Sequence, residues 1–244
     1  MHQDFLPPGI AVLTGAGISK ESGIDTFRDE GGLWTRVNLE EVATIDAWFR
    51  DKKKVLDFYN ETRRAFRSAD ITPNAAHEAL ARLEREYDGE VTIITQNIDP
   101  LHEMAGSRKV IHMHGRDGEV RCMACKTEFA SDADLTPQSV CPNCQSVGEL
   151  RPNIVWFGEM PMHLDEIYEV LERCGLFIAI GTSGEVYPAA GFVLHVRRRQ
   201  PRAHTVELNL EPTDSKTLFH EHIYGPATEV VPPYVTRILK QGWR

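Results

Sequence analysis

The sequence has no apolar run long enough to cross a membrane, since no stretch approaches the roughly 18 residues that a bilayer requires. It also has no apolar core of a secretory signal near its start, where residues 1–9 hold the acidic Asp4 and the two prolines Pro7 and Pro8. Both absences predict a protein that is not associated with membranes. We expect it in the cytoplasm.

Basic residues are also fewer than acidic ones. The 244 residues hold 27 lysines and arginines against 36 aspartates and glutamates, so the formal net charge is −9. Such a surface disfavours a general binder of nucleic-acid phosphates and suits basic, Lys-rich peptide partners better. The length and the 41% hydrophobic content allow one large domain with a small satellite, and we expect a monomer.

Short apolar runs rich in β-branched residues alternate along the chain with helical patterns. We expect strands at residues 10–14, 91–95, 110–113, 176–180 and 205–208, and a weaker candidate at 222–224. We expect helices at residues 53–67, 74–86, 164–173, 189–199 and 233–240. Strands that are apolar on both faces are typical of a parallel sheet covered on both sides. The pattern therefore predicts an α/β fold with a Rossmann-like, doubly wound parallel sheet.

One segment, residues 120–150, breaks this alternation. It holds four of the five cysteines as the pairs Cys122-x-x-Cys125 and Cys141-x-x-Cys144, separated by 15 residues. Two such pairs can place four thiolates around one Zn²⁺ ion, and the spacing is typical of a zinc ribbon. Because the protein would fill all four positions, the zinc would be structural and would stabilise a segment that has no core of its own. Four free or disulfide-linked thiols are the alternative.

The insert suggests how the chain is divided. We predict a discontinuous Rossmann-like domain, residues 1–119 and 151–244, interrupted by a zinc-ribbon insert, residues 120–150.

The first predicted strand leads directly into Gly15-Ala16-Gly17-Ile18-Ser19. Glycines at such a turn let the backbone approach a pyrophosphate, and the start of a helix offers unpaired N–H groups. The third glycine of the usual dinucleotide fingerprint would fall at Lys20 and is missing, so an ordinary dehydrogenase site is not expected. The loop Thr26-Phe27-Arg28, followed by Trp34, could cover a bound dinucleotide. A solvated surface loop is the alternative.

Taken in order, the motifs of this chain resemble those of the sirtuins. They are Gly15–Ser19 with Thr26–Arg28, Thr95–Asp99, His114-Gly115, the four-cysteine ribbon and Gly181-Thr182-Ser183. The tracts Arg151–Pro161, Val186–Gly191 and Asn209–Pro212 are similar to those of the bacterial, CobB-type members. The resemblance covers residues 10–227. It implies an NAD-consuming protein lysine deacylase that releases free lysine, nicotinamide and O-acyl-ADP-ribose.

The resemblance also implies which residues contact NAD, the co-substrate. They are Gly15, Ala16, Gly17, Ser19, Thr26, Phe27, Arg28, Trp34, Gln96, Asn97, Ile98, Asp99, Gly181, Thr182, Ser183, Asn209, Leu210, Glu211 and Ala227. Many of them follow a predicted strand, and ligands of open α/β sheets bind at the carboxyl ends of strands. Asp99 would accept from the nicotinamide amide, and Asn97 would hold a ribose hydroxyl or a water. A helix N-cap is the alternative role for Asp99.

His114 is the catalytic candidate, together with Asn97. A neutral histidine can take a proton from a ribose hydroxyl near pH 7, which would let that hydroxyl attack the acyl carbon. His112 would lie on the same face of an extended segment, so alternation does not choose between the two. The choice of His114 depends on the His-Gly match to the family.

The resemblance further implies where the acylated lysine binds. Val155, Trp156, Phe157, Gly158 and Glu159 would form an extended edge that pairs with the substrate peptide. In members that remove succinyl or malonyl groups, a Tyr and an Arg three residues later bind the acyl carboxylate, and a small Ala leaves room for it. Ala43 and Tyr59 match this pattern, but Thr62 stands where Arg is expected and Arg63 is next along the helix. We therefore expect neutral acyl groups such as acetyl to be handled well and acidic ones poorly.

Three other functions use the same features. An NAD-dependent protein ADP-ribosyltransferase would pass the same activated ribose to a different acceptor. A zinc-ribbon module that only senses NAD would need no catalytic histidine. A redox dehydrogenase would be revealed by the absorbance of reduced nicotinamide.

Overall fold

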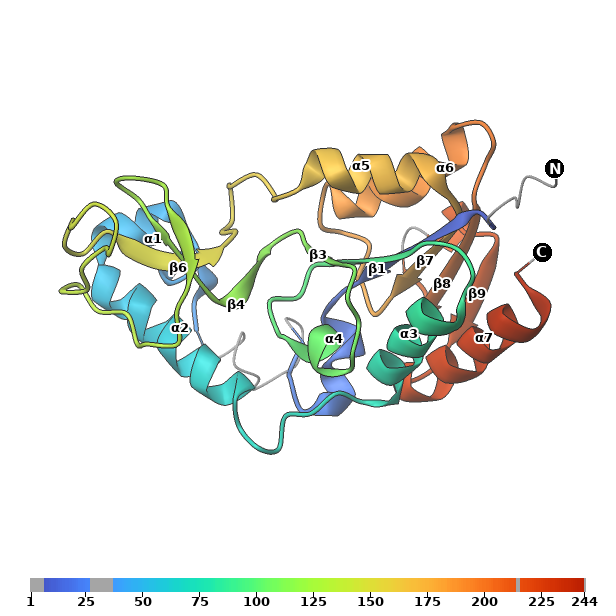
Figure 1. The fold of residues 1–244 in the computed structure, drawn as a ribbon, viewed down its shortest axis with the longest axis horizontal. Coiled ribbons are helices and arrows are strands. Elements are labelled where there is room, and N and C mark those ends of the chain that lie inside the picture. The colour runs from blue at the N-terminus through green and yellow to red at the C-terminus, as the bar shows by residue number, and fades with distance from the viewer. Residues whose placement is uncertain (1–6, 27–36, 214–215, 244) are drawn as a thin grey trace.

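The computed structural model describes residues 7–26, 37–213 and 216–243. Its main sheet has six parallel strands in the order β3-β2-β1-β7-β8-β9. The strands are β1 (Gly9–Thr14), β2 (Val91–Thr95), β3 (Val110–His112), β7 (Cys174–Ile180), β8 (His204–Asn209) and β9 (Glu221–Tyr224). All six expected strands are present, the weaker one included, and the predicted α/β, doubly wound fold is confirmed (Figure 1).

Helices cover both faces of this sheet, as apolar strands require. Along β1, Ile10 and Val12 face a cluster with α3 (Ala75–Glu86) and α7 (Ala227–Gln241). Ala11 and Leu13, one residue out of phase, face the opposite cluster with α5 (Leu164–Arg173) and α6 (Phe192–Arg198). Figure 1 shows α5 and α6 above the sheet and α3 and α7 below it. The period of two along a strand therefore separates two hydrophobic layers.

Two helices differ from their expected bounds. The last helix begins at Ala227, six residues before the predicted start at residue 233, and it continues through Pro232 and Pro233. Both prolines lie beyond the first turn, so each removes an N–H that would otherwise donate within the helix. The predicted helix at 189–199 is a 3-10 turn, Ala189–Gly191, followed by the shorter α6.

A smaller lobe is built around the cysteine-rich segment. Strands β4 (Gly115–Cys122), β5 (Glu128–Ala130) and β6 (Leu150–Ile154) form an antiparallel sheet in the order β5-β4-β6. Helices α1 (Ile45–Arg50) and α2 (Lys52–Phe66) pack against it, on the left of Figure 1. The core of this lobe joins apolar side chains of the helices, such as Trp48 and Leu56, with Val120, Leu135 and Leu150. The insert thus shares its core with residues that precede it by more than fifty positions.

The main sheet brings the carboxyl ends of its strands together. Thr14 at the end of β1 is in register with Thr95 of β2 and Ile180 of β7. The loops that leave these strands therefore meet along one edge, next to the junction with the smaller lobe. Helix α4 (Leu101–Met104) lies close behind this edge. Within the described ranges, no helix is both long enough and apolar enough to span a membrane.

Candidate active site and metal centre

The loop after β1 is interlocked with the loop after β7. A Cβ at Gly15 would lie 2.8 Å from the carbonyl oxygen of Gly181, and one at Gly17 would lie 2.7 Å from Gly181 Cα. Gly181 itself has φ +60°, a left-handed conformation that favours glycine. The N–H of Gly17 donates to Gly181 O at 2.9 Å. These glycines therefore allow the two loops to touch.

Polar side chains join the ends of β2, β7 and β8. Gln96, which follows β2, donates through Nε2 to Thr182 Oγ1 at 3.2 Å. Asn209, the last residue of β8, donates through Nδ2 to the carbonyl oxygen of Thr182 at 2.8 Å. Residues predicted from separate motifs are thus in direct contact, and they form one polar edge of the sheet.

Asn97 and Asp99 are buried behind this edge and are bound to the first loop. Asn97 Nδ2 donates to Gly15 O at 3.2 Å and to Ser19 Oγ at 3.1 Å, and Ser19 Oγ donates to Asp99 Oδ2 at 2.9 Å. Asp99 Oδ1 accepts from the N–H of Leu101 at 3.1 Å, at the start of α4. Asp99 therefore contacts both the loop and the first residue of α4, although the N-cap of that helix is Pro100. Burial raises the pKa of Asp99 above its ordinary value.

Two histidines follow each other closely here and have different partners. His114 lies at the turn from β3 into β4, and its Nδ1 is 3.0 Å from the carbonyl oxygen of Gln96. Because a carbonyl can only accept, the proton is on Nδ1, and the neutral ring keeps a lone pair on Nε2. Burial lowers the pKa of His114, although the bond to Gln96 opposes the shift, so the ring is neutral at pH 7.

His112 has no nitrogen available for a substrate. Its Nδ1 is 3.2 Å from Asn97 O, and its Nε2 is 2.7 Å from Glu103 Oε1. Arg116 approaches the same Glu103 oxygen at 3.5 Å. The geometry thus distinguishes two residues that alternation along the strand could not. Among the described residues, Nε2 of His114 has no hydrogen-bond partner, whereas His112 binds the carbonyl oxygen of Asn97.

Several of the other described residues with an implied NAD role follow the ends of β7 and β8. Gly184 N and Glu185 N donate to the hydroxyls of Thr182 and Ser183, respectively, so the loop is held by its own side chains. Leu210 and Glu211 are exposed after β8, and Ala227 begins α7. Ala16, Ile98 and Thr26 also lie within the described ranges, whereas Phe27, Arg28 and Trp34 lie outside the described residues.

The segment 155–159 is held on one side by backbone contacts. The N–H of Val155 donates to His114 O and that of Phe157 donates to Ala43 O, both at 2.9 Å. Trp156 is buried and packs against Trp48 and Tyr59 at ring centroid distances of 5.9 and 6.3 Å.

The two residues that follow Trp156 are exposed to solvent, whereas Trp156 is buried. The Phe157 side chain is 59% exposed, and Gly158 is exposed with φ +85°. Trp156 therefore belongs to the core, and its two successors face solvent.

Glu159, the last residue of this segment, binds two arginines and a backbone N–H. Its Oε1 accepts from Arg121 and Arg151, each at 2.8 Å, and its Oε2 accepts from Arg151 at 2.9 Å and from the N–H of Trp156 at 2.8 Å. Arg151 is fully buried and lies 3.1 Å from the centroid of the Trp156 ring. Glu159 therefore fixes the segment by charge-assisted hydrogen bonds, and its carboxylate points into the protein.

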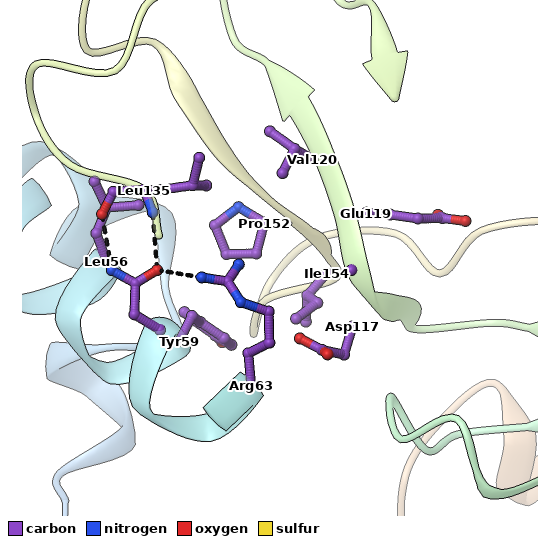
Figure 2. A pocket seen from close by; sticks show the side chains of 11 residues that line it. Leu56, Tyr59, Arg63, Asp117, Glu119, Val120, Leu135, Pro152 and Ile154 are labelled. Atoms are coloured by element: carbon purple, nitrogen blue, oxygen red, sulfur yellow. Dashed lines mark hydrogen bonds between the residues drawn. The ribbon is translucent and has the colours of Figure 1, made fainter. Parts of the chain in front are cut away.

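The four residues expected near the acyl group are buried in or beside α2. Thr62 donates to the carbonyl oxygen of Phe58 at 2.9 Å. Arg63 Nη2 donates to Asn60 Oδ1 at 3.0 Å and to Asp134 Oδ1 at 2.7 Å. Tyr59 and Arg63 line a small cavity between α2 and the small sheet, and Asp117 lies near Arg63 in the same lining (Figure 2). Ala43 is buried on the neighbouring segment.

The four cysteines of the insert converge. Their Sγ atoms all lie within 4.8 Å of one another, and the distances Cys122–Cys144 and Cys125–Cys141 are both 3.8 Å. A disulfide would need about 2.0 Å. Four sulfurs placed about 2.3 Å from a zinc ion at tetrahedral corners lie about 3.8 Å apart. The donor set fits Zn²⁺ in a closed, structural site.

Some residues that shape this site were not singled out from the sequence. His102, Thr14 and Glu103 lie directly behind Asn97 and His112. A threonine ending each of two neighbouring apolar strands, Thr14 and Thr95, is the sequence signal that could have drawn attention to them. His102 has no such signal, because a histidine in a short helix has no pattern of its own.

Comparisons with known proteins agree with this geometry. The Sir2 family profile matches residues 15–188. An NAD-dependent protein deacylase of Trypanosoma brucei brucei is 53% identical over 232 residues, 94% of each chain. One of Escherichia coli strain K12 is 51% identical over 233 residues, 96% of this chain and 83% of the relative. A mutant Sir2 homologue solved with 2′-O-acetyl ADP-ribose superposes with a TM-score of 0.84 at 39% identity, covering 97% of this chain and 94% of that one.

Proposed function

The chain belongs to the Sir2 family and is an NAD-dependent protein deacylase, and from this premise we propose which of its residues do what. The reaction converts NAD⁺, an acylated lysine and water into nicotinamide, O-acyl-ADP-ribose and free lysine. Its difficult step is the attack of a weak nucleophile, the amide oxygen of the acyl group, on C1′ of the nicotinamide ribose. The enzyme must therefore hold both substrates in line and favour the cationic, sugar-like transition state.

NAD is held along the joined strand ends. We assign its phosphates to Gly15–Gly17 and the loop Gly181–Ser183, where backbone N–H groups and hydroxyls are available. The adenosine extends toward Asn209, Leu210, Glu211 and Ala227. The nicotinamide amide donates to Asp99, and Asn97 orients the ribose. The support is the direct contact between these segments, above all Gln96 to Thr182 and Asn97 to Gly15.

His114 acts as the base. The observation that carries this proposal is the hydrogen bond from Nδ1 to Gln96 O, which leaves the lone pair of Nε2 free next to the ribose-binding residues. The ring takes a proton from a ribose hydroxyl, and the resulting oxygen attacks the acyl carbon. Asn97 is held by Gly15 O and Ser19 Oγ, so it can keep that hydroxyl in place.

Mass spectrometry of an acetylated peptide incubated with the enzyme tests the proposed reaction. With NAD, the peptide should lose one acetyl group, and nicotinamide and O-acetyl-ADP-ribose should appear in equal amounts. Without NAD, the peptide should be unchanged. A gain of one ADP-ribose on the peptide, with the acetyl group retained, would instead identify an ADP-ribosyltransferase.

We also propose that the enzyme prefers neutral acyl groups. Among the described residues that line the cavity beside Tyr59, Arg63 is the one cation, and it is already paired with Asp134. The carboxylate of Asp117 lies near Arg63, whereas the Glu119 side chain points away and is paired with Arg116 (Figure 2). Burial raises the pKa of Asp117 above its ordinary value, although the positive charges of Arg67 and Arg63 lower it. An acyl carboxylate brought here would be a buried charge without a free partner, which costs roughly 3 kcal/mol or more.

Comparison of acetyl-lysine and succinyl-lysine forms of one peptide gives a direct measurement. We expect kcat/KM for succinyl removal to be lower by about a hundredfold, the equivalent of roughly 3 kcal/mol. Asp134→Asn should narrow the gap to about tenfold, because it releases Arg63 from its anionic partner. Asp132→Asn is the matched control, since Asp132 binds Arg67 instead. Equal rates on both peptides in the unchanged enzyme would contradict the proposal.

The substrate peptide, the cellular location and the division of the chain are also open to a proposal from these residues. The enzyme acts on acylated lysines of proteins, and we propose that the substrate peptide lies along Phe157 and Gly158, the exposed part of the segment 155–159. We propose a cytoplasmic monomer that does not bind nucleic acid, supported by the net charge of −9 and the thiol-rich insert. We also propose the division into residues 1–119 with 151–244 and the insert 120–150. The support is the convergence of the four cysteines within residues 120–150.

A further inference from the structure

A line of buried polar groups runs behind the loop 96–99. The N–H of Asn97 donates to Thr95 Oγ1 at 3.1 Å, and Thr14 Oγ1 donates to Thr95 Oγ1 at 2.9 Å. On the other side, Thr14 Oγ1 is 3.0 Å from Nε2 of His102 in α4. Thr14, Thr95 and His102 are all completely buried. The two threonines are register partners at the carboxyl ends of β1 and β2.

Hydrogen-bond directions in this line are determined by its chemistry. The single hydroxyl proton of Thr14 is used toward Thr95, so Thr14 can only accept from His102. His102 must therefore carry its proton on Nε2, and its Nδ1 is an acceptor. Burial lowers the pKa of His102 well below its ordinary value, so the ring carries no second proton at pH 7.

A second buried histidine extends the same arrangement. Nδ1 of His77 in α3 accepts from the N–H of Asn74, so the neutral ring of His77 carries its proton on Nε2. Burial lowers the pKa of His77 to about 4. The rings of His77 and His102 are edge to face with centroids 5.0 Å apart. The hydrogen bonds of His77 and those of His102 are thus compatible with one set of tautomers, and the two rings meet through a ring contact rather than a hydrogen bond.

These two histidine rings are not expected to add much to the stability of the fold. His77 Nε2 and His102 Nδ1 are buried without a hydrogen-bond partner among the described residues. Buried polar atoms without partners are unfavourable, and an apolar side chain of similar size would avoid that cost. A polar ring at this position is therefore better explained by the bond it donates to Thr14 than by packing.

We infer that His102 is a positioning residue, which holds the Asn97 backbone N–H, and with it the loop 96–99, through the hydroxyls of Thr14 and Thr95. The inference rests on the proposed function, because it takes this loop to be the site of the nicotinamide and its ribose. Loss of the line frees the loop backbone while Asn97 keeps its side-chain bonds to Gly15 and Ser19. NAD then binds less well, whereas the peptide, which lies on the segment 155–159, is little affected.

Nitrogen-15 NMR of the histidine rings tests the hydrogen-bond directions without reference to activity. Both His102 and His77 should show the neutral form protonated at Nε2 at pH 7. A proton on Nδ1 of His102 would overturn the inference, because Thr14 would then lose its donor.

Steady-state kinetics test the function of the line. His102→Leu and Thr14→Val should each raise KM for NAD about tenfold, the size expected for one neutral hydrogen bond. KM for the acetylated peptide should change less than twofold. His102→Gln, whose amide nitrogen can reach the place of Nε2, should bring KM for NAD back to within about threefold of the unchanged enzyme. The double variant should be no worse than either single one, because both remove the same line.

Two further variants separate the possible failures. Thr92→Val, a buried threonine of β2 outside the line, should leave both KM values unchanged. The role of His102 is structural, and the inference is wrong, in either of two cases. In the first, the His102 and Thr14 variants raise KM for NAD and KM for the peptide equally. In the second, His102→Gln does not restore KM for NAD. Asp99→Ala should raise KM for NAD strongly. If Asp99→Ala has no effect, the assignment of the loop to NAD fails, whereas an effect of Asp99 but none of His102 refutes only this inference.

Discussion

His114→Ala should lower kcat for deacylation by roughly 10³-fold or more, within the 10²- to 10⁴-fold range that a positioned base contributes. The reason is the free lone pair on Nε2, which the bond from Nδ1 to Gln96 O leaves available. The dissociation constant for NAD should stay within about threefold, because the loops that contact NAD are held by other side chains. Single-turnover measurement of O-acyl-ADP-ribose formation and equilibrium binding of NAD give the two quantities.

The surface residue His195 provides the control. His195 lies in α6 and is bound to Glu172 of α5, so His195→Ala should leave both quantities unchanged. Near-normal turnover by His114→Ala would reject the assignment of the base. A matching loss in NAD binding would show that the ring serves structure instead.

The pH profile of the unchanged enzyme follows from the same ring. His114 must be neutral to accept a proton, and burial lowers its pKa below the ordinary value of 6.5. Activity should therefore persist at pH 6.5 and fall only as the pH drops through the lowered pKa of the free enzyme. The acid limb of kcat/KM should have its midpoint below pH 6.5. A midpoint above pH 6.5 would mean that the group is not shielded from solvent or that another group controls the limb.

The sequence was sufficient for the main sheet because each strand is apolar on both faces and so stands out from its surroundings. The smaller lobe could not be outlined in the same way. Its strands β5 and β6 are short, and its core depends on Trp48 and Leu56, which precede the insert by many residues. Helix α7 was predicted too short because Pro232 and Pro233 read as a break, although both lie in its N-terminal half.

The site residues could be predicted where motifs place them at strand ends. The role of a residue could not be predicted where it depends on a hydrogen-bond partner far away in the sequence. Residues 96–99 and 181–183 fall at one edge because parallel strands end there. The state of Arg63 depends on Asp134, 71 residues later, and no helical pattern contains that information. Likewise His112 and His114 share a face by alternation, and only the positions of Glu103 and Gln96 distinguish them.

The zinc site has the largest expected effect on structure. Cys141→Ser should abolish stable zinc binding, because a structural site needs all four thiolates. Zinc contributes roughly 10–16 kcal/mol to small zinc-binding units, at least as much as the whole stability of a typical domain. Residues 120–150 should then lose their protection from hydrogen exchange, while the main sheet keeps it. Deacylation should fall by at least about tenfold, because Leu135, Leu150 and Cys141 share one core with Tyr59 and Trp156.

Cys174→Ala is the matched control for that variant. Cys174 is a buried cysteine at the start of β7, outside the four-cysteine cluster, so its loss should leave zinc content and exchange of residues 120–150 unchanged. If the Cys141→Ser variant keeps one zinc per chain, the four-thiolate site is wrong. If it loses zinc but keeps both exchange protection and activity, the insert folds without metal, and the shared core rather than the ion holds the smaller lobe against Trp156.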